Sequence, residues 1–259
     1  MYSIIDTHIH LDMYANTKRN KIIETLEKYK IEALISVSTH LKSSKENLNL
    51  SKKNSKIKPA FGFHPEQKMP TEDMIQKLFT FIDNHAHEMI AIGEVGLPYY
   101  LRREDQSIPI EPYVELLEAF IKKAKQFNCP IVLHAIYDDA PIVCHLLEKY
   151  SIQKAHFHWF KGEAKTIDRL KKNGYYISIT PDIFYKERTR KLIEVFPIQQ
   201  IMVETDGPWR FEGPFKDKMT HPSMLHEVIK EISKVKKIPL NEVYTTLYEN
   251  SKNFYSLTT

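Results

Sequence analysis

The stretch Tyr2-Ser3-Ile4-Ile5-Asp6-Thr7-His8-Ile9-His10 opens with a short apolar run and closes with two histidines separated by one residue. Residues 2–7 have the apolar and β-branched character of a buried strand. Because side chains alternate between the two faces of a strand, His8 and His10 point the same way, as two ligands of one metal ion must. A histidine pair at this spacing is weak evidence alone, so its weight depends on whether other strands carry similar residues.

The same pattern, an apolar run followed by a metal-binding or acid–base side chain, recurs along the chain. The later runs of this kind end near His64, Glu94, His134, His158 and Asp206. Two further apolar runs, residues 32–37 and 175–179, end without such a residue. In all, the strand candidates are residues 2–7, 32–37, 57–62, 89–93, 131–134, 154–158, 175–179 and 200–204. A single histidine is more often a hydrogen-bonded polar residue than a ligand, but the recurrence at strand ends favours a metal-dependent hydrolase.

Segments with helical periodicity separate the strand candidates. The clearest one lies between the fourth and fifth candidates, where Tyr113, Leu117 and Ile121 belong to one apolar stripe. Further helices are expected at residues 21–29, 71–85, 139–150, 163–173 and 186–196, at Pro222 and after Pro239. Eight strands alternating with about eight helices imply parallel strands and right-handed crossovers. The α/β pattern therefore predicts a single (β/α)8 TIM barrel over residues 1–259, with a doubly wound open sheet as the alternative.

The composition is that of a globular protein of barrel size, with 259 residues, 42% of them hydrophobic and 27% charged. Cys129 and Cys144 are too few for a disulfide framework and indicate a reducing compartment. A signal-peptide pattern and an apolar run of about 18 residues are both missing, so we expect a cytoplasmic protein without a membrane span. The net charge of +4 is compatible with a polyanionic partner but does not require one.

In such a barrel the carboxyl ends of all strands meet at one mouth, where active sites lie. The expected metal ligands there are His8, His10, Glu94, His134, His158 and Asp206. Imidazoles and carboxylates without thiolate suit zinc, manganese, nickel or magnesium. Six ligands exceed one open zinc site and are enough for two divalent ions about 3.5–4 Å apart. Glu94 is then the natural bridge between the ions, and Asp206 is placed to hold one ion and accept a proton from water.

Other residues near the strand ends are expected to surround the ligands. His64 is expected to meet either substrate or metal, and His156 is expected to be a buried, hydrogen-bonded histidine behind the ligands. Two aromatic pairs, Tyr99-Tyr100 and Trp159-Phe160, and the single Trp209 follow strand ends. They form either walls on which a nucleobase stacks or part of the loop packing.

With these motifs in view, the chain resembles the TatD family of metal-dependent deoxyribonucleases in the amidohydrolase superfamily. The resemblance spans nearly the whole chain and is carried by Asp6-Thr7-His8-Ile9-His10, Gly62-Phe63-His64-Pro65, Gly93-Glu94-Val95-Gly96-Leu97, Pro130-Ile131-Val132-Leu133-His134, His158-Trp159-Phe160-Lys161-Gly162 and Glu204-Thr205-Asp206-Gly207-Pro208. It implies a (β/α)8 barrel, two divalent ions on the six ligands named above, and hydrolysis of DNA, with single strands or strand ends as the expected form. It also implies catalytic roles for Asp206 and Glu94, and substrate- or water-positioning roles for His64 and Glu204.

The chain departs from the family pattern where substrate contacts are expected. Pro98 replaces a customary aspartate, and His134 is followed by Ala135 rather than leading to an arginine that meets phosphate. The turn after the seventh strand reads Thr180-Pro181, and the last loop reads Thr220-His221-Pro222 in place of an Asn-x-Pro. Candidates to restore the missing positive charge are Arg102, Arg103, Arg210 and Lys216, which fall in loops after the fourth and eighth strands.

Three functions remain open at this point. The first is a two-metal phosphodiesterase acting on DNA. The second is hydrolysis of a small ester, lactone or amide by the same metal centre, which the missing arginine motivates. The third is a nuclease-like subunit that binds nucleic acid or a partner within a larger complex, which the altered loops allow and the intact ligand set disfavours.

Overall fold

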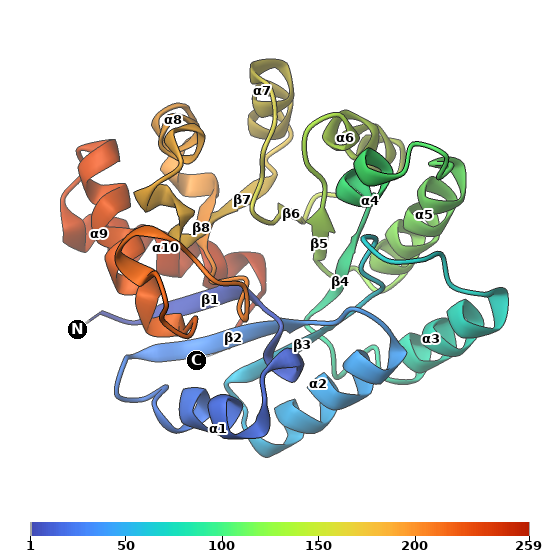
Figure 1. Ribbon diagram of the computed structural model, residues 1–259, viewed down its shortest axis with the longest axis horizontal. Helices are drawn as coiled ribbons and strands as arrows, with labels where there is room; N and C mark the ends of the chain where they lie inside the picture. Colours follow the sequence, from blue (N-terminus) through green and yellow to red (C-terminus); the bar gives the residue numbers. More distant parts are fainter. Residues whose placement is uncertain (1, 259) are drawn as a thin grey trace.

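The computed structural model describes residues 2–258 and contains an eight-stranded parallel sheet in the order β1-β2-β3-β4-β5-β6-β7-β8. Each strand pairs with the next one along the chain (Figure 1). The strands are β1 (Ile4–Ile9), β2 (Ile31–Val37), β3 (Ile57–Phe61), β4 (Ala91–Gly96), β5 (Ile131–His134), β6 (Ala155–Phe157), β7 (Tyr176–Ile179) and β8 (Ile201–Val203). This order is that of a barrel, and it excludes the doubly wound sheet, whose strand order would reverse at a switch point.

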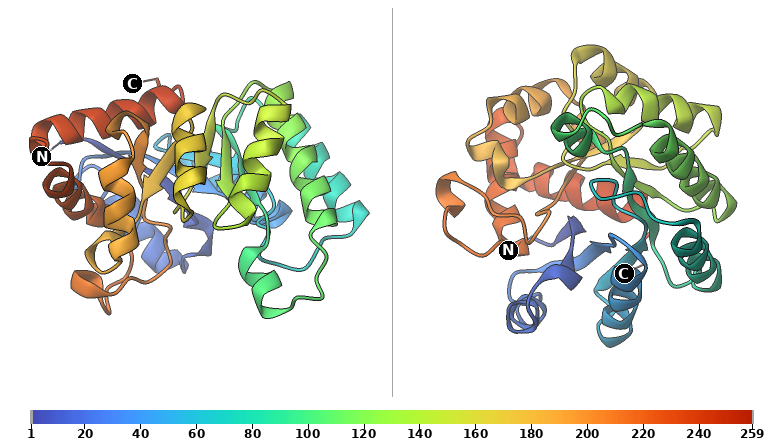
Figure 2. Two further views of the ribbon diagram at one scale, coloured as in Figure 1. Left: turned by 90° about the horizontal axis from the view of Figure 1, so that it is seen from above. Right: turned by 45° about the vertical axis from the view of Figure 1, so that its right-hand side comes forward.

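The helices lie outside the strands (Figures 1 and 2). They are α1 (Asn16–Glu24), α2 (Leu41–Lys53), α3 (Glu72–Asn84), α4 (Tyr99–Glu104), α5 (Glu111–Gln126), α6 (Asp139–Lys149), α7 (Ala164–Lys172), α8 (Glu187–Val195), α9 (Leu225–Lys236) and α10 (Leu240–Phe254). Short 3-10 segments are η1 (Leu11–Met13), η2 (Pro181–Phe184), η3 (Ile198–Gln200), η4 (Gly213–Phe215) and η5 (Pro222–Met224). Across residues 2–258, no helix is both long and apolar enough to span a bilayer.

The helices differ from the predictions at four places. Helix α4 was not expected, and the helix expected at Pro222 begins at Leu225, after η5. The helix expected at residues 21–29 is instead α1, which begins earlier and ends at Glu24. Helix α2 was not predicted, because the side chains it buries include Ser43, Ser44 and Asn47, so it lacks a clear apolar stripe. Asn47 bonds to the Ser36 and Ser38 hydroxyls of the adjoining strand segment, which explains why a polar face is buried there.

The barrel closes where β8 runs on past its last paired residue beside β1. The backbone N–H of Asp206 donates to the His8 carbonyl at 2.9 Å, and that of His10 donates to the Gly207 carbonyl at 2.7 Å. The Thr7 hydroxyl also donates to the Val203 carbonyl at 3.0 Å. These bonds join the two ends of the sheet, so the predicted (β/α)8 TIM barrel is confirmed.

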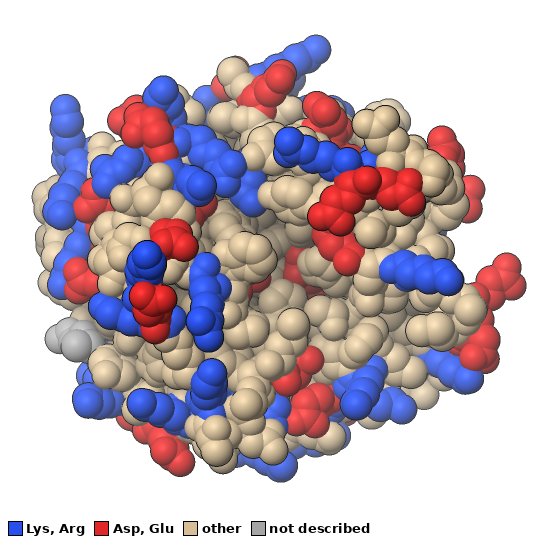
Figure 3. Space-filling model, viewed as in Figure 1, with Lys and Arg blue, Asp and Glu red and all other residues tan. Residues whose placement is uncertain are grey.

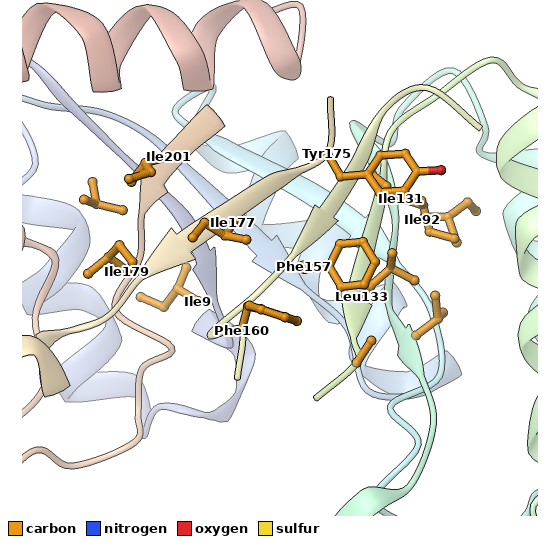
Figure 4. Close-up of a cluster of buried hydrophobic side chains, with 14 of the residues drawn as sticks. Ile9, Ile92, Ile131, Leu133, Phe157, Phe160, Tyr175, Ile177, Ile179 and Ile201 are labelled. Carbon is orange, nitrogen blue, oxygen red and sulfur yellow. The ribbon is translucent and has the colours of Figure 1, made fainter. Parts of the chain in front are cut away.

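Alternating side chains build two apolar layers. The outer layer, between strands and helices, includes Ile92, Ile131, Leu133 and Phe157, which lie together in Figure 4. The inner layer fills the barrel and is formed by Ile5, Ala33, Ile35, Val37, Ala60, Ala91, Val132 and Met202 with Phe254 and Tyr255 from the C-terminal helix region. The packed interior leaves the strand ends as the place for polar chemistry.

Register irregularities occur in the two strands that carry the central polar residues. The β1–β2 pairing shifts between Asp6 and Ile9, and the β4–β5 pairing shifts between Ile92 and Val95. His8 and Glu94 therefore lie inside strands that run two or three residues further than expected, rather than beyond their ends. Such irregularities re-aim side chains, and both face the barrel mouth here.

Candidate metal centre

Glu94 is the centre of a buried polar cluster at the barrel mouth. Its side chain is completely inaccessible to solvent, yet five histidine rings approach its two carboxylate oxygens within 3.4 Å. The rings divide into two sets, one for each oxygen. This division brings together residues from five different strands and loops.

The first set surrounds the Glu94 Oε2 atom. The Nε2 atoms of His8 and His10 lie 3.2 Å and 3.3 Å from that oxygen. Each of these nitrogens also lies 3.4 Å from the Asp206 Oδ1 atom. Two imidazole nitrogens and two carboxylate oxygens thus face one common point.

The second set surrounds the Glu94 Oε1 atom. The His158 Nε2 atom lies 2.7 Å away, the His134 Nδ1 atom 3.1 Å and the His64 Nε2 atom 3.4 Å. The structure thus places His64, whose role the sequence left between substrate and metal, beside the other potential ligands. Ligand atoms of His64, Glu94 and His134 are close enough to share an ion, as are those of His8, His10 and Glu94.

Several of these buried atoms have no hydrogen-bond partner within the described chain. They are both ring nitrogens of His8, Nδ1 of His10, Nδ1 of His158 and Oε2 of Glu94. A buried polar atom without a partner is costly, and such atoms are uncommon in native proteins. Two of them, His8 Nε2 and Glu94 Oε2, lie 3.2 Å apart beside His10 Nε2, and a cation at this point would satisfy both.

The negative charges of the buried carboxylates also favour a cation at the cluster. Burial would raise the pKa of Glu94, but His158, His64 and His8 hold it well below its usual range. Burial would lower the pKa of His8 and His10, but the Glu94 and Asp206 carboxylates raise both to about 9. Two ionised carboxylates in the interior therefore attract positive charge, which protons or metal ions supply.

A further carboxylate, Glu204, faces the His158 ring nitrogen that does not face Glu94. It is fully buried, accepts a hydrogen bond from the Trp159 backbone N–H at 2.8 Å, and lies 3.5 Å from the His158 Nδ1 atom. The Ser178 hydroxyl donates to it at 2.5 Å. The family resemblance implies a substrate- or water-positioning role for Glu204, and its ligand atoms also lie close enough to those of His8 and His158 to share an ion.

His156 is the buried, hydrogen-bonded histidine that was expected. Its Nε2 atom lies 2.6 Å from the Ser178 hydroxyl and its Nδ1 atom lies 2.8 Å from the Tyr255 hydroxyl. Both ring nitrogens are thus satisfied within the protein, and the side chain is fully buried. His156 thus contacts Ser178, which donates to Glu204, and is not part of either ligand set.

Both ligand sets open into a cavity of about 840 Å³. Its wall consists of His10, Met13, Thr39, His64, Glu66, Glu94, Tyr100, His134, Ile136, His158, Trp159, Lys161, Asp206, Pro208, Trp209 and Arg210. Figure 3 shows a hollow near the centre of one face of the molecule, with both basic and acidic side chains on its rim. A cavity of this volume is within the range that accommodates small ligands or single nucleotides.

The expected aromatic walls are present in part. Tyr100, Trp159 and Trp209 line the cavity, and Trp209 is 58% exposed. Phe160 instead packs in the outer apolar layer. Tyr100 and Trp209, which are exposed, are therefore available for stacking, whereas the Trp159 ring lies against the Lys161 ammonium group.

Sequence reasoning missed two charged residues of the cavity. Glu66 lies 3.1 Å from the outer His134 Nε2 atom and accepts from the backbone N–H groups of Tyr100 and Leu101. Lys161 lies three residues after His158. The available signal was that Lys161 stands in the motif His158-Trp159-Phe160-Lys161-Gly162 and that Glu66 directly follows Gly62-Phe63-His64-Pro65.

The candidates for the missing positive charge are narrowed by the structure. Of the four, only Arg210 is among the described residues that line the cavity. Arg102 instead lies 3.5 Å from the Asp139 carboxylate. Arg210 is thus the one of the four candidates that the structure places at the cavity, where Lys161 also lines the wall.

The altered last loop also has a structural explanation. The Thr220 hydroxyl donates to the Trp209 carbonyl, and the Thr220 carbonyl accepts from the Tyr14 hydroxyl at 3.0 Å. His221 accepts the Ser223 N–H at the start of η5. Thr220 and His221 thus fix the segment that presents Trp209 to the cavity.

A (β/α)8 barrel whose mouth gathers histidines around buried carboxylates defines a metal-dependent hydrolase. The sequence model of the TatD-related DNase family matches residues 5–256. The chain belongs to that family.

Individual relatives agree with this assignment. The chain is 38% identical to an uncharacterized metal-dependent hydrolase of Haemophilus influenzae, over 98% of this chain and all of that protein. It is 27% identical to human deoxyribonuclease TATDN3, over 97% of this chain and 94% of the relative. Among solved structures, the TatD homologue YjjV from Escherichia coli superimposes with a TM-score of 0.87 at 20% identity, covering 98% of each chain.

Proposed function

We propose that the protein is a phosphodiesterase that hydrolyses DNA with two divalent metal ions at Glu94. The observation that carries this proposal is that each Glu94 oxygen faces its own set of histidine nitrogens. One ion would be held by His8, His10, Glu94 and Asp206, and the other by Glu94, His134 and His158, with His64 next to them. Magnesium, manganese, zinc and nickel all suit this donor set.

When bound, such a pair of ions supplies Lewis acidity and lowers the pKa of bound water. The residues of the chain do the rest. Glu94 would hold the two sites together, and the Glu204 carboxylate lies 3.5 Å from the His158 Nδ1 atom behind the second site. Asp206 lines the cavity beside the first set, with its Oδ1 atom 3.4 Å from the Nε2 atoms of His8 and His10. It is therefore placed to accept the proton of the attacking water.

The shape of the site favours single strands or strand ends over intact duplex. The ligand sets lie within a cavity of about 840 Å³, which has room for a nucleotide but not for a double helix. Tyr100 and Trp209 line the cavity with exposed rings on which bases stack without sequence preference. The deoxyribonuclease name of the human relative supports DNA as the substrate class.

The test is metal-dependent cleavage of a substrate panel by wild type, Asp206→Asn and Asp168→Asn. Asp168 is exposed on α7 and serves as the matched control. We expect cleavage of single-stranded DNA by wild type and Asp168→Asn, and a loss of about 10³-fold or more in Asp206→Asn. Circular dichroism would establish that both variants are folded.

The panel also distinguishes the two rival functions. Cleavage of small esters, lactones or amides, with nucleic acids left intact, would replace the proposal by a small-molecule hydrolase. DNA binding without cleavage, tested with magnesium, manganese, zinc and nickel, would replace it by a nucleic-acid-binding subunit. Undiminished cleavage by Asp206→Asn would refute the proposed centre.

A further inference from the structure

Lys161 is a buried cation that the metal centre does not use. Its side chain lines the cavity and the residue is only 9% exposed. Among the described residues, no carboxylate oxygen lies within 4.0 Å of its ammonium group; the ion pairs present involve other cations. Burial therefore lowers the pKa of Lys161, and nearby Arg188 lowers it further. A buried charge without a counter-ion is unfavourable unless a ligand supplies one.

Two aromatic rings hold the Lys161 side chain in place. Its ammonium nitrogen donates to the Tyr100 hydroxyl at 3.0 Å and lies 4.3 Å from the centre of the Trp159 ring. A second cation–π contact, 5.5 Å long, is made with the Tyr100 ring. The Lys161 backbone is also fixed, because its carbonyl accepts the Tyr137 N–H at 2.6 Å.

The rings are themselves anchored. The Trp159 indole N–H donates to the Asp182 carboxylate at 2.8 Å, and the Trp159 backbone N–H donates to Glu204. Asp182 is buried and is also held by the Thr189 hydroxyl at 2.9 Å. The Tyr100 backbone donates to Glu66 at 2.8 Å. Lys161 is thus presented on a rigid support, which is how specific binding residues are built.

The N–H donors of the Lys161 ammonium group indicate what kind of ligand it binds. An ammonium group has three N–H donors, and within the described chain only the Tyr100 hydroxyl accepts one of them. The other donors are available to an anion in the same cavity as the ligand sets. Of the described residues in the loop that follows β5, only Ile136 lines the cavity, so this loop contributes neither lysine nor arginine to the wall.

We propose that Lys161 binds a non-bridging oxygen of a substrate phosphate and makes the cavity selective for phosphate esters over neutral carbonyl substrates. This inference rests on the proposed function, since it concerns the substrate of the same site. It predicts a sequence-independent contact, because phosphate contacts do not read bases. Arg210, on the exposed rim of the cavity, adds a weaker and more screened attraction.

The test measures binding rather than turnover. A fluorescent single-stranded oligodeoxythymidylate is titrated into wild type, Lys161→Met, Lys161→Arg and Lys165→Met in the presence of a chelator, so that hydrolysis does not occur. Lys165 is exposed on α7 and provides the matched control. Methionine keeps most of the aliphatic stem and removes the charge. Thermal unfolding checks that each variant is folded.

We expect Lys161→Met to weaken binding about tenfold or more, as when a hydrogen bond to a charged group is lost. The slope of log K against log salt should become shallower by about 0.7, the value for one single-strand phosphate contact. Lys161→Arg should keep most of the affinity and the full slope, and Lys165→Met should match wild type. Equal affinity and equal slope in Lys161→Met would overturn the inference, as would absence of oligonucleotide binding by wild type.

A second readout separates this inference from the proposed function. With metal present, Lys161→Met should raise KM for phosphodiesters while leaving hydrolysis of any neutral ester substrate unchanged. Lys161-dependent binding together with no DNA cleavage by wild type would support the phosphate contact and refute the nuclease proposal. Normal binding by Lys161→Met together with loss of cleavage in Asp206→Asn would refute only the phosphate contact.

Discussion

Replacing Glu94 by glutamine should remove ion binding at both ligand sets at once. The substitution keeps the shape of the side chain but removes the negative charge that the two sets share, with nitrogens 2.7–3.4 Å from its oxygens. Loss of an outer-shell partner alone weakens metal binding 10–100-fold. Loss of the anionic ligand itself should therefore weaken each site by about 100-fold or more.

The size of the effect on stability follows from mass action. An ion at 100 times its Kd stabilises the wild-type fold by about 2.7 kcal/mol, whereas a 100-fold weaker site at the same concentration gives about 0.4 kcal/mol. For a chain of this size these values correspond to Tm increases of roughly 5–10 °C and about 1 °C. The chelated proteins provide the reference for each variant.

The assay is thermal unfolding with and without manganese or zinc, combined with metal analysis of the dialysed proteins. Glu115→Gln, an exposed position on α5, is the matched control and should behave like wild type. Asp206→Asn should lose ion binding only at the first set, because its Oδ1 atom approaches His8 and His10 alone. A Tm increase of several degrees in Glu94→Gln would refute the shared-carboxylate geometry.

Three further predictions concern stability. Gly96→Ala should destabilise the fold by about 3 kcal/mol or more in urea unfolding, because a Cβ atom there would overlap the His134 carbonyl oxygen. A free energy of unfolding close to that of wild type would contradict the close packing of β4 on β5. Phe157→Ala should lower the free energy of unfolding by about 3–5 kcal/mol in the same assay, since this fully buried ring stacks on Tyr175 at 5.9 Å. A decrease below about 1 kcal/mol would contradict the packing of Phe157 in the outer apolar layer. Burial raises the pKa of Asp139 to about 6, above its ordinary value of 3.8, so its contribution to stability is present below pH 3.8 and is lost as the pH rises through 6. Wild type should therefore lose roughly 2.4 kcal/mol relative to Asp139→Asn between pH 4 and pH 7. A pH-independent difference would show that Asp139 is not buried as an acid.

Local sequence patterns predicted the fold well because a barrel repeats one unit, a strand followed by a helix. Each apolar run of four to eight residues is followed by a periodic helix, and this alternation leaves few topologies open. Where the rule is broken by polar burial, as in α2 with Asn47, the pattern gave no signal. Strand ends in β1 and β4 were also misplaced, because register shifts depend on the neighbouring strand rather than on the strand itself.

The chain by itself determined which chemistry is available: histidines and carboxylates after apolar runs, without thiolate ligands, in a (β/α)8 frame. Only the tertiary structure decided how these groups meet. It gave each Glu94 oxygen its own set of histidines, moved Glu204 behind His158, and brought Lys161 between Tyr100 and Trp159. The physical reason is that distance and direction between residues up to about 200 positions apart are set by barrel closure and packing, which no local sequence pattern encodes.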